Sequence, residues 1–184
     1  MTVAFMLWRR LDTPGHDACR LEENDTSWIL DGMSVFCQNG VPASLAYRVV
    51  CDFKWYTERG YVQGWIGAQP VELSIQRERD GVWTLNGVTV SNLENCIDLD
   101  LGFTPATNLV PLRRLALRED QAADSLAAWL DVSAGILEVL PQRYERRAGT
   151  KYWYEAPSVD YAAMLEVTQI GFIRRYPGLW EAEM

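Results

Sequence analysis

Hydrophobic and polar residues alternate along most of the chain. The clearest case is LAYRVVCDFKWY, residues 45–56, which places Leu45, Tyr47, Val49, Cys51, Phe53 and Trp55 on one face of an extended segment. The segments VELSIQRER, which begins at Val71, and YAAMLEVT, which begins at Tyr161, alternate in the same way. Because successive side chains of a β-strand point to opposite faces, this period of two predicts half-buried strands.

Short turn signals separate these segments. They are the pairs Asp31-Gly32, Arg59-Gly60, Asp80-Gly81, Asn86-Gly87, Ala148-Gly149 and Ile170-Gly171, each with a glycine that tolerates positive φ. Strands joined by short turns are typical of antiparallel meanders, and the pattern contains roughly a dozen strands, which in one sheet must curl or close. We therefore predict a mainly β fold over residues 1–184, a single-domain curved antiparallel sheet that forms a barrel or half-barrel with few or no helices.

The segment REDQAADSLAAWLDV, residues 118–132, fits two structures. Its composition suits a helix, with Asp120 or Asp124 as the N-cap, and such a helix would sit in the mouth of a barrel. It also alternates, since Leu126, Ala128, Leu130 and Val132 share one strand face. We favour the strand because long strand patterns flank the segment.

The composition fits one globular domain. The chain has 184 residues, of which 48% are hydrophobic and 23% charged, so it can bury a core without disulfides or a metal. Its four cysteines form no CxxC pair, which argues against zinc-ribbon and thioredoxin-like sites, and we expect no cofactor. Eight tryptophans are many for this length, and tryptophan serves both in cores and in the walls of ligand cavities.

The charge and the chain start bear on partners and location. A net charge of −8, with only Lys54 and Lys151 as lysines, disfavours nucleic-acid binding and charge-driven membrane binding. The start, MTVAFMLWRR, lacks the basic region and cleavage site of a signal peptide, and no apolar run approaches the ~20 residues of a membrane helix. We expect a cytoplasmic protein with reduced thiols and no integral membrane segment.

The densest group of charged residues lies at 95–115, NCIDLDLGFTPATNLVPLRRL. If the first part is a strand, Asp98 and Asp100 share one face. If PLRRLAL is also extended, Arg113 falls among the apolar residues Leu115 and Leu117. An arginine removed from water needs a carboxylate partner, so the pattern predicts that Arg113 pairs with one of the two aspartates.

Three interpretations of this group remain open. The pair is an internal salt bridge that fixes strand register, or it is a polar cluster at the end of a cavity that grips hydroxyls or an anionic head group. The third is catalytic: Asp98 and Asp100 act as an acid and a base or nucleophile, because carboxyls ~5–5.5 Å apart suit a retaining glycosidase.

The stretch CIDLDLGFTPATNLVPLRRL, residues 96–115, resembles the central motif of the bacterial glycolipid-binding family, roughly C-x-D-x-D, then TPxTN, then a proline and RRL. Other matching pieces follow the family order: DFKW at 52–55, DGVWTLNG at 80–87, PQRYERR at 141–147, KYWYE at 151–155 and YPGLW at 176–180. The chain departs from the pattern at Ala106, where the family usually has an aromatic residue, and at Val110-Pro111-Leu112, where it has Leu-Pro-Ile. The resemblance implies a single β-rich domain with an apolar cavity that binds a glycolipid or lipid.

The sole histidine, His16, stands beside Asp17, but the chain has no G-x-S-x-G elbow, and a surface turn is the simpler interpretation. Aromatic residues around YWY, 152–154, would stack on sugar rings, line an acyl cavity or simply pack in the core. We therefore expect a small amphipathic ligand, with a small hydrolase or a non-binding, dimerising protein as the alternatives. The candidate ligand-binding residues are Asp52, Trp55, Asp98, Asp100, Asn108, Arg113, Arg114, Gln142, Tyr144, Tyr152 and Tyr154.

Overall fold

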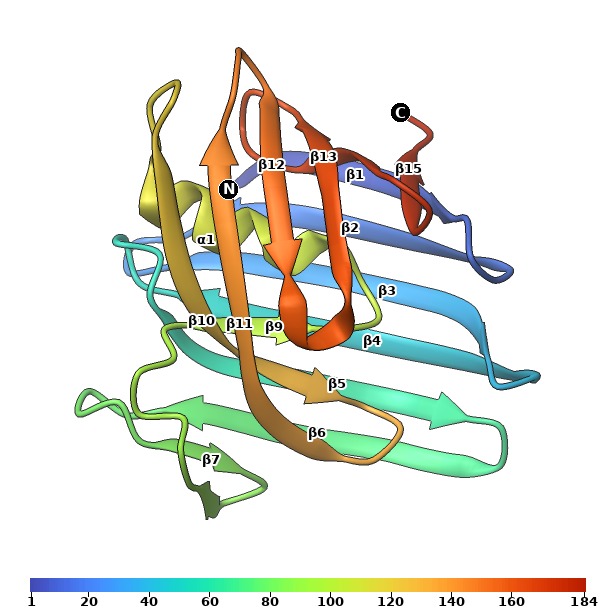
Figure 1. Cartoon of the computed structure of the whole chain (residues 1–184). Helices are drawn as coiled ribbons and strands as arrows, with labels where there is room; N and C mark the ends of the chain where they lie inside the picture. Colours follow the sequence, from blue (N-terminus) through green and yellow to red (C-terminus); the bar gives the residue numbers. More distant parts are fainter.

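The computed structural model describes residues 1–184 and contains one sheet of fifteen strands (Figure 1). The strands are β1 (Thr2–Arg10), β2 (Gly15–Glu23), β3 (Trp28–Gln38), β4 (Val41–Cys51), β5 (Thr57–Ile66), β6 (Gln69–Arg77), β7 (Trp83–Leu85), β8 (Val88–Val90), β9 (Asp98–Leu101), β10 (Ala122–Asp131), β11 (Ile136–Arg146), β12 (Lys151–Ala156), β13 (Tyr161–Val167), β14 (Ile173–Tyr176) and β15 (Trp180–Ala182). The only α-helix is α1 (Leu109–Leu115), and two short 3₁₀ turns, η1 (Ala106–Asn108) and η2 (Pro157–Val159), complete the chain. The mainly β prediction is confirmed.

The sheet is curved but not closed. Its order is β8-β7-β6-β5-β4-β3-β2-β1-β15-β14-β13-β12-β11-β10-β9, so β8 and β9 are free edges and the half-barrel is the correct form. All pairs are antiparallel except β9 with β10. The two ends of the chain meet in the middle of the sheet, where Trp8 of β1 is opposite Ala182 of β15.

The curvature makes two layers with α1 between them. Figure 1 shows β1 to β7 as one layer and β10 to β13 crossing it, with α1 and β9 in the space between. Leu109, Val110 and Leu112 of α1 are buried there, in one continuous core of 40 hydrophobic residues. Thr57 of β5 ties β9 to this first layer, since its Oγ1 accepts a hydrogen bond from the Leu99 N–H at 3.1 Å.

Two local predictions have opposite outcomes. Most of the ambiguous segment 118–132 forms a strand, β10 (Ala122–Asp131), which confirms the alternation pattern. The expectation that PLRRLAL is extended is wrong, because this segment forms α1. Pro111 lies in the first helical turn, where the missing N–H costs nothing, and Ala116 ends the helix with a φ of 45°.

Four of the six expected turns occur, but two of the glycines lie inside strands. Gly32 is in β3 and Gly60 is in β5. A Cβ at Gly32 would collide with the ring of Tyr47, and a Cβ at Gly60 would collide with the side chain of Leu99. Both glycines therefore give room for a side chain to cross the inner face of the sheet.

The contact at Gly60 gives a test of the two-layer packing. Gly60→Ala should lower the free energy of unfolding by about 1–3 kcal/mol, because the added methyl overpacks against the fully buried Leu99. The double variant Gly60→Ala/Leu99→Ala should lose less than the sum of the two single variants in urea denaturation. Additive losses would show that the two side chains do not compete for the same space.

Candidate functional site

A buried ion pair joins α1 to β9. Arg114 donates from Nε to Asp98 Oδ1 at 2.8 Å and from Nη2 to Asp98 Oδ2 at 2.6 Å. Ser125 of β10 donates to the same Oδ2 at 2.7 Å. The Asp98 side chain is 1% exposed and that of Arg114 is 13% exposed, so this bidentate pair is shielded from water.

The prediction that Arg113 pairs with an aspartate is wrong. A helix turns by about 100° per residue, so Arg113 points away from Asp98 and is exposed. The Arg113 guanidinium lies 5.5 Å from the centre of the Trp55 ring. Arg114, not Arg113, is the partner of Asp98.

A second set of polar groups continues along the same inner face. Gln142 Nε2 donates to Asp100 Oδ2 at 2.7 Å and to the Tyr154 hydroxyl at 3.0 Å. Asn108 Nδ2 donates to the Tyr144 hydroxyl at 3.1 Å, which in turn donates to Gln142 Oε1 at 3.4 Å. Strand register brings these residues together, since Tyr144 and Tyr154 are directly opposite in β11 and β12.

Asp100, Asn108 and Tyr154 from this network also face a cavity of about 280 Å³, which we call the aromatic cavity. It lies at the amino end of α1, and nine of its thirteen lining residues are hydrophobic. The other lining residues are Gly102, Thr104, Trp129, Leu140, Ala156, Val159, Tyr161, Tyr176, Leu179 and Trp180. The ring centres of Tyr161 and Tyr176 are 5.2 Å apart, and Val159, 50% exposed, marks the open side.

Burial changes the acid strength of Asp100. Removal of its carboxylate from water raises its pKa to about 6, the hydrogen bond from Gln142 lowers it, and the negative charge of Asp98 raises it. Asp100 therefore changes its charge near neutral pH and is able to donate or accept a hydrogen bond at the wall of the cavity.

Four of the eleven candidate residues belong neither to the ion pair nor to this network and do not line the cavity. Trp55 stacks on Trp28 with ring centres 4.9 Å apart, and Asp52 caps its own loop by accepting from the Lys54 and Tyr56 amides. Tyr152 is buried beside Arg146. Trp55 and Tyr152 lie with Arg113 near the carboxyl end of α1.

Several cavity residues were not among the sequence candidates. They are Thr104, Trp129, Tyr161, Tyr176 and Trp180. The YPGLW motif contains Tyr176 and Trp180 and was the available signal, whereas Trp129 lies in the ambiguous segment 118–132. Trp129, Tyr161, Tyr176 and Trp180 come from β10, β13, β14 and β15, which lie in the same half of the sheet. No local sequence pattern encodes that sheet order.

His16 and Asp17 do not form a catalytic pair. His16 is in β2 rather than in a turn, on the outer face, with Nε2 3.4 Å from Glu183. Asp17 points inward, is 1% exposed, and accepts a hydrogen bond from the Tyr47 hydroxyl at 2.8 Å. Its Oδ2 has no hydrogen-bond partner, and burial raises the pKa of Asp17 to about 7.

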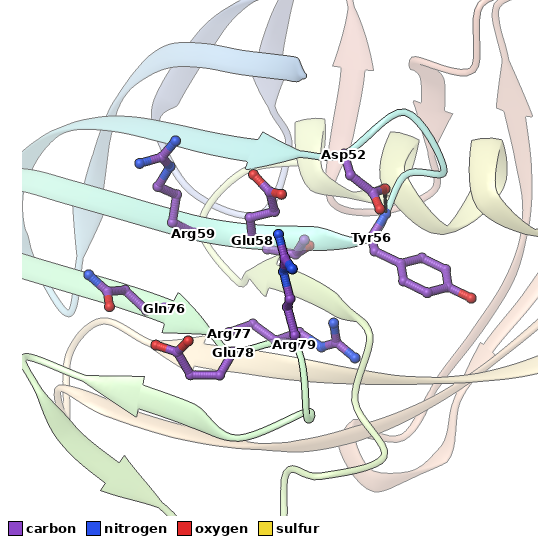
Figure 2. A pocket seen from close by; sticks show the side chains of 9 residues that line it. Asp52, Tyr56, Glu58, Arg59, Gln76, Arg77, Glu78 and Arg79 are labelled. Carbon is purple, nitrogen blue, oxygen red and sulfur yellow. Dashed lines mark hydrogen bonds between the residues drawn. The ribbon is translucent and has the colours of Figure 1, made fainter. Parts of the chain in front are cut away.

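A second depression, the charged groove, is drawn in Figure 2. Its volume is about 520 Å³, and it is lined by Asp52, Tyr56, Thr57, Glu58, Arg59, Gln76, Arg77, Glu78 and Arg79. Figure 2 shows Asp52 and Tyr56 at one end of the groove and Arg59 and Gln76 at the other. The lining includes three acids and three arginines but only one hydrophobic residue, so the groove does not suit an apolar chain.

Two further features bear on the class of protein. None of the helices is both long and apolar enough to cross a membrane. No group of three or more His, Cys, Asp or Glu side chains is placed to hold a metal ion. The fold and the site therefore define a curved β-sheet protein with a partly enclosed aromatic cavity and a buried polar network beside it.

Comparison with known proteins identifies the family and supports the fold. The family described as "Putative glycolipid-binding" matches residues 5–182, and the chain belongs to this family. The chain is also similar to a crystal structure of a DUF1089 family protein from Pseudomonas aeruginosa, with 25% sequence identity, a TM-score of 0.80 and 91% of each chain covered. No curated protein matches the chain.

The ion pair gives a direct stability test. Arg114→Ala should cost roughly 3–5 kcal/mol, because it leaves the Asp98 carboxylate buried without a cation. Arg113→Ala, the matched control one residue away, removes an exposed cation–π contact worth about 0.5–1 kcal/mol. Urea denaturation measures both losses, and equal losses would contradict the assignment of the buried pair to Arg114.

Asp17 predicts a pH dependence of stability. Its pKa is about 7 in the folded protein and 3.8 in the unfolded chain, so between these values the folded state holds the extra proton. Stability should therefore fall as pH rises from about 4 to 7, by a few kcal/mol at most, and then level off. In Asp17→Asn the free energy of unfolding should no longer show this decrease between about pH 4 and 7. An identical pH profile of unfolding for the wild type and the variant would show that Asp17 is ionised throughout.

Proposed function

We propose that this protein is a non-enzymatic binder of one small amphipathic molecule, glycolipid-like or lipid-like, which it holds in the aromatic cavity. The observation that carries the proposal is the makeup of the cavity: nine hydrophobic lining residues stand beside Asp100, Thr104 and Asn108. Binding sites for small molecules are typically apolar with a few placed polar groups, and the cavity volume of about 280 Å³ is near the lower end of their usual ~300–1,000 Å³. The name of the family supports the ligand class.

The polar wall suits a head group that carries hydroxyls rather than a charge. Gln142 occupies Oδ2 of Asp100, which leaves Oδ1 to accept from a ligand hydroxyl. Asn108 and Thr104 offer further donors and acceptors, and the rings of Tyr161 and Tyr176 give flat faces on which a sugar ring packs. An anionic head group is disfavoured here, because it would meet the carboxylate of Asp100.

The hydrolase alternative has less support. A two-carboxylate mechanism needs both acids to face the substrate. Asp98 does not line the aromatic cavity, and both of its oxygens are held by Arg114 and Ser125. Only Asp100 faces the cavity, which fits recognition of a hydroxyl group better than acid–base chemistry by a pair.

Octyl glucoside tests the binding proposal. It should bind in a saturable way and change tryptophan emission, because Trp129 and Trp180 line the cavity. Asp100→Asn should weaken binding roughly tenfold or more, since a hydrogen bond to a charged group is worth ~1.5–3 kcal/mol. Leu140→Trp, which fills the cavity, should abolish it.

The matched control is Asp124→Asn, which makes the same change on an exposed strand position of β10. It should leave the affinity for octyl glucoside unchanged. Binding that survives Leu140→Trp would move the ligand out of this cavity. Hydrolysis of aryl glucosides by the wild type, lost in Asp100→Asn, would replace the binding proposal with the enzymatic one.

A further inference from the structure

A larger hollow lies at the carboxyl end of α1, and we call it the basic hollow. Its volume is about 560 Å³, and it shares no residue with the aromatic cavity. Three segments form it: the end of α1 with Leu117, the turn between β11 and β12, and the turn between β13 and β14. The lining residues are Leu112, Arg113, Ala116, Leu117, Arg146, Gly149, Thr150, Tyr152, Val167, Thr168, Gln169, Ile170 and Gly171.

The inner wall of the basic hollow is apolar. Leu112, Leu117, Tyr152 and Val167 each keep no more than 7% of their surface exposed, and Ile170 is half-buried beside them. These side chains offer a water-poor surface for a hydrocarbon chain at the foot of the hollow.

The charge of the hollow is of one sign. Its thirteen lining residues include Arg113 and Arg146 but no acid, in a chain whose net charge is −8. The neighbouring Glu119 accepts a hydrogen bond from the Gly149 amide at 2.7 Å. An anion that enters the hollow therefore meets two guanidinium groups and no carboxylate in the wall.

The two arginines are held in different ways. Arg146 is fixed by donation from Nη1 to the Leu117 carbonyl at 2.8 Å and from Nε to the Gly149 carbonyl at 3.2 Å. Arg113 makes no hydrogen bond or ion pair within the protein, yet its position is set, because its guanidinium lies over Trp55. A Cβ at Gly171 would lie 3.4 Å from Cδ of Arg113, at ordinary contact distance, so the arginine stem runs alongside the turn between β13 and β14.

We propose that the basic hollow is a second binding site, for an amphiphile with a single anionic head group, either a carboxylate or a phosphate. The head group pairs with the free N–H groups of Arg113, with Arg146 adding charge, and the chain lies against Leu112, Leu117 and Val167. This site takes the opposite head-group chemistry from the aromatic cavity and does not depend on the function proposed for that cavity.

Dodecanoate and its uncharged counterpart dodecanol test the proposal by calorimetry and tryptophan emission. Dodecanoate should bind in a saturable way and alter the emission of Trp55, because the ligand competes for the guanidinium stacked on that ring. Arg113→Gln should weaken dodecanoate binding roughly tenfold to a hundredfold and change dodecanol binding less than about threefold. Arg59→Gln, the matched control on an exposed arginine without a protein partner, should leave both unchanged.

Dodecyl phosphate, acetate and inorganic phosphate separate the possible ligands. Dodecyl phosphate that binds more tightly than dodecanoate identifies a phosphate head, and the reverse identifies a carboxylate. Tight binding of acetate or inorganic phosphate alone would overturn the amphiphile proposal in favour of a free-anion site. Dodecanoate binding that is lost in Leu140→Trp but kept in Arg113→Gln would place this ligand in the aromatic cavity and also overturn it.

Discussion

The bidentate pair between Arg114 and Asp98 fixes how α1 and β9 pack between the two layers of the sheet. A curved sheet that does not close leaves a gap between its layers, and α1 with β9 fills that gap. Both elements are short, and a seven-residue helix has little stability by itself. A buried charge without its partner is costly, so the pair admits only registers of α1 and β9 in which the guanidinium and the carboxylate meet. The hydrogen bond from Ser125 extends the same constraint to β10.

The two ends of α1 adjoin different hollows. The aromatic cavity lies at the amino end of α1, and the basic hollow lies at its carboxyl end. One end presents Asp100 with tyrosine and tryptophan rings, and the other presents Arg113 and Arg146. The two ends of α1 therefore adjoin hollows of opposite polar character, which is the basis for the two head-group preferences proposed above.

Buried polar groups in this protein are of two kinds. Asp98 is fully satisfied and serves the fold, whereas Asp17 and Asp100 keep pKa values of about 7 and about 6 because burial is only partly compensated. Asp100 opens to a cavity and is available to a ligand. Asp17 lies behind Tyr47, whose hydroxyl is 3.1 Å from Oγ1 of Thr104, itself a residue of the cavity wall.

The sequence by itself determined the mainly β fold, the strand at β10, the family and seven of the residues in the polar network and its ion pair. Alternation is a local property with a period of two, so it can be read without knowledge of partners. Only the tertiary structure decided that residues 109–115 form a helix, and with it that Arg114 rather than Arg113 meets Asp98. It also decided that Gly32 and Gly60 clear space inside strands, and that residues from β10, β13, β14 and β15 share a cavity. These outcomes depend on which side chains face each other across the layers, and that is set by the packing of segments far apart in the chain.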